Sequence, residues 1–227
     1  MPVDKDVMID ATDVNKEYRR AGAIIRALAD VSITIRAGEF VVIQGPTGCG
    51  KSTLLNVLSG LDLPNSGKII FDGENIARAT ETRLAKIRRQ KVGMVFQDFN
   101  LIKTLTAVEN VESMLWPTVL SNKEIENRAI AALRDVNMLE RKDHFPVEMS
   151  GGEKQSIAIA RAIVGKPRVI FADEPTGNLD PDSENQIMEL LKEINRNYET
   201  TILCVSHRNS VAKFGDRTVK MDNGRII

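Results

Sequence analysis

The chain has 227 residues, 42% of them hydrophobic, which suits one domain, or one domain with an inserted lobe, around a substantial core. Its 31 basic and 31 acidic residues cancel, so no overall field attracts it to nucleic acid or anionic lipid. Two cysteines cannot form a disulfide framework, and the opening residues lack the apolar run of a signal peptide. No stretch approaches the ~18 apolar residues of a membrane helix. We therefore expect a cytosolic chain without a nucleic-acid partner, whose membrane-spanning partners, if it has any, are separate polypeptides.

The expected elements begin with strands, become mostly helical from about residue 106, and then alternate again. An apolar strand at 40–44 runs into a glycine-rich loop and a helix at 51–59. Further on, Ile187, Leu190, Leu191 and Ile194 follow the spacing of an amphipathic helix, whose opening turn carries Pro181, Asp182 and Glu184, as a helix N-terminus favours. The other strands are expected at 7–14, 31–35, 68–71, 92–96, 169–172, 201–205 and 218–221, and the other helices at 81–90, 106–116, 121–137 and 151–164.

Alternating strands and helices indicate an α/β fold with a largely parallel sheet that is covered on both faces. We expect a single domain over 1–227. A core lobe at 1–97 and 165–227 would be interrupted by a helical subdomain at 98–164.

The segment GPTGCGKST at 45–53 fits the phosphate-loop pattern G-x-x-x-x-G-K-[ST]. Glycines let the backbone wrap tightly and aim N–H groups at phosphate oxygens, and the following helix adds its positive end. Lys51 is expected to reach the β- and γ-phosphates of ATP, and the Ser52 hydroxyl to bind Mg²⁺. The alternative is a tight turn with coincidental residues, which the strand before it and the helix after it argue against. The candidate nucleotide-binding residues here are Gly45, Pro46, Thr47, Gly48, Cys49, Gly50, Lys51, Ser52 and Thr53.

Two acids end the apolar strand RVIFADE, at Asp173 and Glu174. Asp173 can reach the phosphate loop from the carboxyl edge of the sheet and hold Mg²⁺ with its water. Glu174 can polarise an attacking water as a general base. Acidic turns after strands are common, so the pair gains its meaning from the phosphate loop.

The segment MSGGEKQ places Ser150 and Glu153 as a capping box at the start of a helix. Gly151 and Gly152 leave backbone N–H groups open to an anion. Taken alone, the pattern fits an ordinary capped helix.

MSGGEKQSIAIARAI followed by FADEPTGNLD resembles the signature region of ABC ATPases, and the resemblance covers essentially the whole chain. It implies a P-loop NTPase core, with a RecA-like mostly parallel sheet and an antiparallel β subdomain, and an inserted α-helical subdomain. It also implies ATP hydrolysis that drives export or extraction of a substrate through separate transmembrane permease subunits. The implied location is the cytoplasmic face of the cell membrane.

Further site residues follow from this resemblance alone. Gln97 matches the glutamine loop that contacts Mg²⁺ and water, Asp180 the D-loop, and His207 the switch histidine near the γ-phosphate. Tyr18 matches the aromatic residue that stacks on adenine. With Glu174 and Lys51, Gln97 and His207 complete the implied catalytic set.

The family also implies a head-to-tail dimer, with an identical copy or a relative. Each ATP then lies between the phosphate loop of one subunit and Ser150, Gly151, Gly152 and Glu153 of the other. The segments around Gln97 and Asp180 resemble the subgroup of lipoprotein-releasing, macrolide-exporting and FtsE-like ATPases.

One alternative remains open, a regulatory ATPase that signals through a membrane partner without transport. The chain also departs from the subgroup pattern at Lys154, Ser156 and Arg208, none of which is expected to take part in the chemistry.

Overall fold

A computed structural model describes residues 6–20 and 22–227; residues 1–5, which belong to the opening segment discussed above, and residue 21 lie outside the described residues. The main sheet has six strands in the order β10-β9-β3-β8-β7-β6, parallel except for β10. This is the expected parallel core. Its strands are β3 (Phe40–Gln44), β6 (Val92–Phe96), β7 (Val169–Asp173), β8 (Thr201–Ser206), β9 (Arg217–Asp222) and β10 (Arg225–Ile226).

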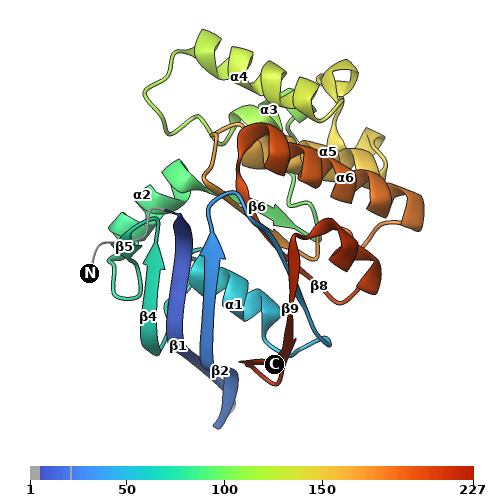
Figure 1. The fold of residues 1–227 in the computed structure, drawn as a ribbon. Helices are drawn as coiled ribbons and strands as arrows, with labels where there is room; N and C mark the ends of the chain where they lie inside the picture. The colour runs from blue at the N-terminus through green and yellow to red at the C-terminus, as the bar shows by residue number, and fades with distance from the viewer. Residues whose placement is uncertain (1–5, 21) are drawn as a thin grey trace.

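A second, antiparallel sheet has the order β2-β1-β4-β5 and lies beside the main sheet (Figure 1). The expected strands at 7–14 and 31–35 were too short, because the hairpin continues well beyond the core. Residues of β2 near the turn are exposed on both faces, so the alternation that marks a strand is missing there. The strands are β1 (Val7–Arg20), β2 (Ala23–Arg36), β4 (Ser66–Phe71) and β5 (Glu74–Asn75).

Helices cover both faces of the main sheet, and several gather at one end of the molecule (Figure 1). The helix expected at 106–116 ends early, and turns occupy the residues before Pro117, which cannot continue a helix. The other ends agree with expectation within two residues or fewer. The helices are α1 (Lys51–Leu58), α2 (Glu81–Lys91), α3 (Ala107–Glu112), α4 (Asn122–Asp135), α5 (Gly151–Ile163), α6 (Pro181–Tyr198), and the short 3-10 helices η1 (Leu139–Arg141), η2 (Pro146–Glu148) and η3 (Asn209–Phe214).

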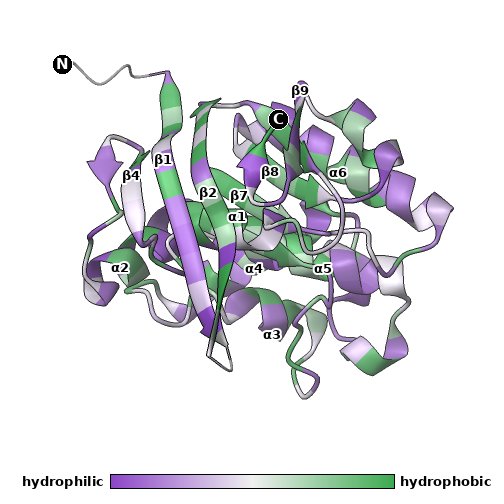
Figure 2. Ribbon diagram, turned by 90° about the horizontal axis from the view of Figure 1, so that it is seen from below, coloured by the Kyte–Doolittle hydropathy of each residue, from purple (hydrophilic) through white to green (hydrophobic). Residues whose placement is uncertain are grey.

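The two faces of β3 belong to two separate cores. Phe40 and Val42 pack with α4, α5 and α6, whereas Val41 and Ile43 pack with α1 and the antiparallel sheet. This alternation follows from the period of a strand that is buried on both faces. Hydrophobic residues accordingly line the interior of both layers (Figure 2).

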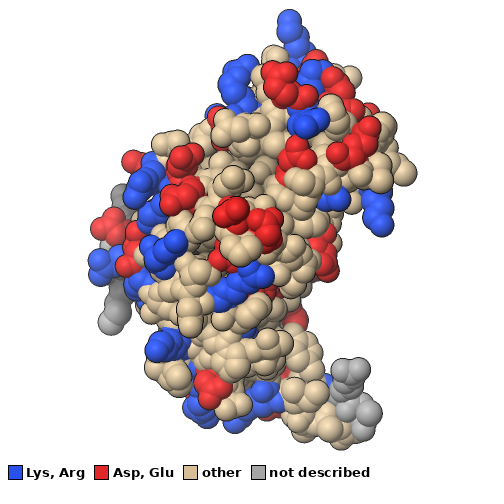
Figure 3. Space-filling model, turned by 90° about the vertical axis from the view of Figure 1, so that its right-hand side faces the viewer, with Lys and Arg blue, Asp and Glu red and all other residues tan. Residues whose placement is uncertain are grey.

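Basic and acidic side chains are interspersed on the molecular face in Figure 3. Basic residues of α2 pair with acids: Arg83 contacts Glu74, and Lys91 Nζ lies 2.7 Å from Asp72. Among the described residues, no helix is both long enough and apolar enough to span a bilayer.

Candidate functional site

Four parallel strands end at the same edge of the main sheet and deliver the predicted residues there. The phosphate loop follows β3, Gln97 follows β6, Glu174 follows β7 and His207 follows β8. Ligands of open α/β sheets bind at this carboxyl edge. A cavity of about 730 Å³ lies there, lined by Tyr18, Ile25, Arg26, Ala27, Thr47, Gly48, Cys49, Gly50, Lys51, Ser52, Thr53, Gln97, Glu174, His207, Asn223 and Gly224.

The phosphate loop has room only for glycine at two of its positions. A Cβ at Gly45 would lie 2.1 Å from the carbonyl oxygen of Met221, and one at Gly50 2.3 Å from that of Ala27. Gly50 caps α1 with a φ of 107°, in the region that favours glycine. The loop therefore approaches its neighbours by backbone alone, and the N–H groups that open α1 face the cavity with the positive end of the helix.

Lys51 is buried inside this loop. Its Nζ donates to the carbonyl oxygens of Gly45 at 2.9 Å and Pro46 at 3.1 Å, and lies 3.6 Å from a Glu174 carboxylate oxygen. These contacts hold the ammonium group at the floor of the cavity. An ammonium group in this position can bind an anionic ligand whose negative charge exceeds that of the Glu174 carboxylate.

Ser52 and Asp173 form the oxygen pair predicted for a metal. The Ser52 hydroxyl donates to Asp173 Oδ1 at 2.9 Å, which links α1 to the end of β7. Burial raises the pKa of Asp173 above its ordinary value, and the nearby Glu174 charge adds to the rise against the opposing hydrogen bond from Ser52. Carboxylate and hydroxyl oxygens are hard ligands that suit a divalent cation, and such a cation would offset the remaining cost of burying the Asp173 charge. Clusters of three or more ligand-type side chains are absent from residues 6–20 and 22–227, so substrate oxygens and water would complete such a site.

Glu174 and His207 lie in direct contact beside Lys51. Nδ1 of His207 is 2.8 Å from Glu174 Oε2, and because a carboxylate only accepts, Nδ1 carries the hydrogen. The backbone of Glu174 has a φ of 47°, which costs about 1–3 kcal/mol in a residue other than glycine. Its N–H donates to the Val205 carbonyl at 3.1 Å, so the sheet maintains this conformation.

Gln97 is tied to a residue that sequence reasoning missed. Its Nε2 donates to Asn178 Oδ1 at 3.0 Å, and Asn178 Nδ2 donates back to the Gln97 carbonyl at 3.2 Å and to Asp98 at 2.9 Å. Asn178 connects the loop after β6 with the loop after β7. The only sequence signal was its place in PTGNLD, between the acidic pair and Asp180.

Tyr18 lies at the rim of the cavity, and Asp62 and Lys16 fix its position. Its hydroxyl donates to Asp62 at 2.8 Å, and Lys16 Nζ lies 2.6 Å from the same carboxylate and 5.0 Å from the Tyr18 ring centre. The ring is partly exposed toward the cavity. It is therefore fixed in orientation and free to stack on a planar group.

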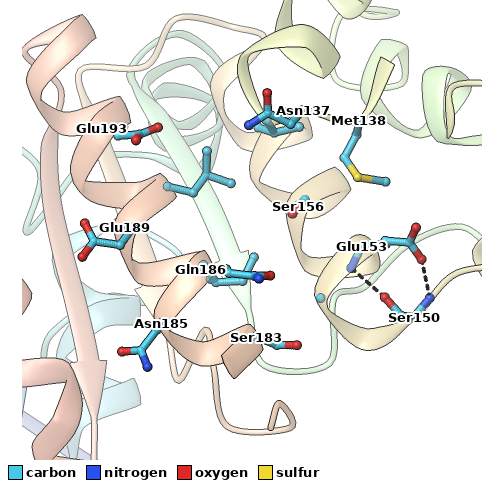
Figure 4. Close-up of a pocket in the computed structure, with 14 residues that line it drawn as sticks. Asn137, Met138, Ser150, Glu153, Ser156, Ser183, Asn185, Gln186, Glu189 and Glu193 are labelled. Atoms are coloured by element: carbon cyan, nitrogen blue, oxygen red, sulfur yellow. Dashed lines mark hydrogen bonds between the residues drawn. The ribbon is translucent and has the colours of Figure 1, made fainter. Parts of the chain in front are cut away.

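Ser150, Gly152 and Glu153 lie apart from this cavity. They line a separate groove of about 560 Å³ between α5 and α6, whose lining shares no residue with the first cavity (Figure 4). The predicted capping box is confirmed: Ser150 Oγ accepts from Glu153 N at 3.2 Å, and Glu153 accepts from Ser150 N at 2.8 Å. That backbone hydrogen bond holds the pKa of Glu153 below its ordinary value.

Gly151 and Asp180 belong to the same side of the molecule. A Cβ at Gly151 would lie 3.1 Å from Leu179, one residue before Asp180. Asp180 caps α6 by accepting from the N–H groups of Asp182 at 3.1 Å and Ser183 at 3.0 Å. Within one chain, the signature residues therefore do not reach the phosphate loop's cavity.

Comparison with known proteins decides between the classes of ATPase that share a phosphate loop. The model of the ABC transporter family matches residues 28–177, which is more than half of the chain. The chain belongs to the ABC transporter family. It is an ABC ATPase, and the expected fold class is confirmed with it.

Relatives agree over almost the whole chain. The ABC transporter ATP-binding protein MJ0796 of Methanocaldococcus jannaschii is 43% identical over 96% of this chain and 95% of its own. A solved dimeric structure of MJ0796, described as a post-hydrolysis state bound to ADP and Pi, superposes with a TM-score of 0.88, 40% identity and 96% coverage of both chains. The macrolide export ATP-binding/permease protein MacB of Chlorobaculum tepidum is 40% identical over 97% of this chain and 34% of MacB.

These findings confirm the predicted family, its macrolide-exporter-like subgroup and the predicted role as the ATP-binding, ATP-hydrolysing subunit of an ABC transporter. None of them favours the alternative of a signalling ATPase without transport.

Proposed function

We propose that ATP binds with Mg²⁺ in the cavity at the carboxyl edge of the main sheet. The observation that carries this assignment is that Lys51, Ser52 and the Glu174–His207 pair all line one cavity. Asp173 is hydrogen-bonded to Ser52 of this lining. The glycine-lined loop would hold the phosphates, and Tyr18 would stack on the adenine at the rim.

Ser52, Asp173 and Gln97 would hold Mg²⁺, which when bound supplies charge neutralisation and orientation of the phosphates. The Ser52–Asp173 hydrogen bond already brings two of these oxygens together. The raised pKa of Asp173 supports the same assignment, because a cation would remove the cost of its buried charge.

Asp173→Asn tests this part of the proposal. We expect Mg²⁺-dependent ATPase activity to fall at least about 100-fold, while the protein without ligand melts at a higher temperature than wild type at pH 7.5. The pKa of Asp173 is raised in the folded state, so its ionisation above the ordinary pKa of about 4 destabilises the fold.

The gain in Tm should therefore shrink as the pH is lowered toward the ordinary carboxyl pKa of about 4, because protonation of the wild-type carboxyl removes its buried charge. Thermal scans across this pH range measure this, and Asp143→Asn, at an exposed carboxylate, is the matched control. A variant that melts below wild type at pH 7.5 would contradict the assignment.

Hydrolysis breaks the bond between the β-phosphate bridging oxygen and the γ-phosphorus as a water oxygen attacks from the opposite side. Glu174 lies where it can orient that water and accept its proton. Lys51 Nζ and the imidazole of His207, each within reach of the Glu174 carboxylate, would stabilise charge on the γ-phosphoryl oxygens. The 2.8 Å contact with Glu174 sets the ring position of His207 before substrate arrives.

A second copy of the chain would complete the site. The groove lined by Ser150, Gly152 and Glu153 lies at a capped helix start whose N–H groups suit an anion, yet it lies apart from the chain's own cavity. A head-to-tail dimer would bring each groove onto the partner's ATP. The dimeric structure described for MJ0796 supports the pairing of two copies.

The core lobe, at 1–97 and 165–227, and the helical lobe, at 98–164, would move against each other as the dimer closes. This motion would be transmitted to a permease subunit. A cavity of about 560 Å³ lies between α2 and the turns after α3, lined by Arg89, Met114, Pro117, Val119 and Leu120 among others. Met114 and Val119 are exposed apolar side chains there. These apolar groups beside a cavity suit a docking site, here for a cytoplasmic helix of a separate transmembrane subunit that exports or extracts a substrate.

Val119→Asp should prevent that docking. We expect at least a tenfold loss of co-purification with membrane proteins from solubilised membranes, because a charge would be buried in an apolar contact. The ATPase rate of the isolated chain should stay unchanged. Leu61→Asp, at an exposed apolar residue far from this cavity in sequence, is the control. Equal recovery of partners with the two variants would contradict the docking site.

A further inference from the structure

Glu184 is a buried carboxylate whose surroundings differ from those expected of a helix N-terminus. It lies in the first turn of α6, where a solvated acid would suffice to interact with the helix dipole. Its exposed fraction is only 5%, however. It accepts hydrogen bonds from Ser210 Oγ and, at 3.3 Å, from Thr176 Oγ1.

Arg208 supplies the opposite charge from another loop. Its guanidinium donates to Glu184 at 2.6 Å, to the Gly177 carbonyl at 3.1 Å and to the Leu179 carbonyl at 3.4 Å. Burial alone would raise the pKa of Glu184, but the hydrogen bonds from Ser210 and Arg208 outweigh burial and hold the pKa below its ordinary value. The pair is therefore ionised.

These contacts connect two loops that both enter the candidate site. Arg208 directly follows His207, and its own backbone is fixed, since Gln44 Nε2 donates to its carbonyl at 3.0 Å and its N–H donates to Ser206 at 3.1 Å. Gly177 and Leu179 belong to the loop that runs from Glu174 to Asp180. The planar fork of Arg208 can hold several acceptors at once, which a lysine cannot.

Only Glu184 of this pair is buried, since the Arg208 side chain is 31% exposed. Such an ion pair contributes little net stability compared with apolar residues of similar size, so its value lies in fixing one arrangement. We propose that Arg208, anchored by Glu184, is a positioning residue that fixes the His207 loop against the loop carrying Asp180. Arg208 does not line the cavity proposed to bind ATP. A displacement of His207 on loss of the γ-phosphate would pass through Arg208 to Asp180, at the side of the molecule that faces the partner. This inference rests on the proposed roles of His207 and Asp180.

The double variant Arg208→Met/Glu184→Gln tests it, because it keeps side-chain volume and leaves no lone buried charge. We expect kcat for ATP to fall roughly 10- to 100-fold, as for a catalytic group displaced by about 1 Å. The Kd for ATP, measured with a fluorescent analogue, should stay within about twofold of wild type, since the phosphate loop is untouched. Arg208→Lys, which keeps the charge but loses the fork, should give an intermediate kcat.

The control is Lys213→Met. Lys213 Nζ donates to Asn185 at 3.1 Å and joins η3 to α6, as Arg208 joins its own loop to α6, but it contacts neither site loop. A double variant with the kcat of wild type and of this control overturns the inference. So does a double variant whose kcat falls only in proportion to a loss of folded protein in thermal scans. A wild-type chain without ATPase activity would overturn the proposed function and the inference together, whereas an active wild type beside a fully active double variant overturns the inference alone.

Discussion

Glu174→Gln is expected to lower ATP turnover by roughly 10²- to 10⁴-fold while ATP still binds. The amide cannot accept the proton of the attacking water, but it has nearly the same shape as the carboxylate. Its neighbours, His207 at 2.8 Å and Lys51 at 3.6 Å, are retained, and the contacts of Lys51 with Gly45 and Pro46 do not involve Glu174. Phosphate release measures turnover, and a fluorescent ATP analogue measures binding.

Exposed Glu140→Gln is the matched control, with the same change of charge outside the cavity. Wild-type turnover in Glu174→Gln would remove Glu174 from the role of general base. Loss of binding together with turnover would assign Glu174 to the architecture of the loop instead.

Gly151→Asp is expected to prevent the dimer from closing while the monomer binds ATP normally. A Cβ at this position meets only Leu179 Cδ2 at 3.1 Å and Phe99 at 3.9 Å, both ends of side chains, so the folded chain can adjust. In a closed dimer the new carboxylate would face the partner's γ-phosphate. Two unit charges 4 Å apart at an effective dielectric constant of 20 repel by about 4 kcal/mol, roughly a 1,000-fold loss in the closing equilibrium.

ATPase activity should fall with the closing equilibrium, which steady-state assays across a range of protein concentrations measure. Gly165→Asp, just beyond the other end of the same helix and with no atom within 4 Å of its Cβ, is the control. A Gly151→Asp protein with the activity of this control would contradict the trans arrangement.

The parts of the site that follow strand ends could be predicted from the sequence. An apolar strand buried on both faces has a clear signal, so β3, β6 and β7 and the loops after them were located to within a residue. The carboxyl ends of parallel strands then meet at one edge, which brings Lys51, Gln97 and Glu174 together. The capping box at Ser150 could also be predicted from the sequence, because it depends on residues three positions apart.

Side-chain partners far apart in the chain could not be predicted from a single sequence. Gln97 and Asn178 are separated by 81 positions, and Arg208 and Glu184 by 24. Glu184 was assigned to the helix dipole because local sequence does not reveal burial. The trans role of the signature residues has no local signal at all, and it came from the family resemblance. The separation of the two cavities is the structural observation that agrees with it.

The shared site is tested most directly by the mass of the hydrolysis-deficient chain in solution. Sedimentation of Glu174→Gln and of Glu174→Gln/Gly151→Asp, each with ATP and Mg²⁺, compares a trapped dimer with one whose signature contact is blocked. We expect a particle of twice the 25.2 kDa chain mass for the first protein and the single chain mass for the second, with equal ATP affinity in the monomers. Dimers of both proteins, or monomers of both, would contradict it.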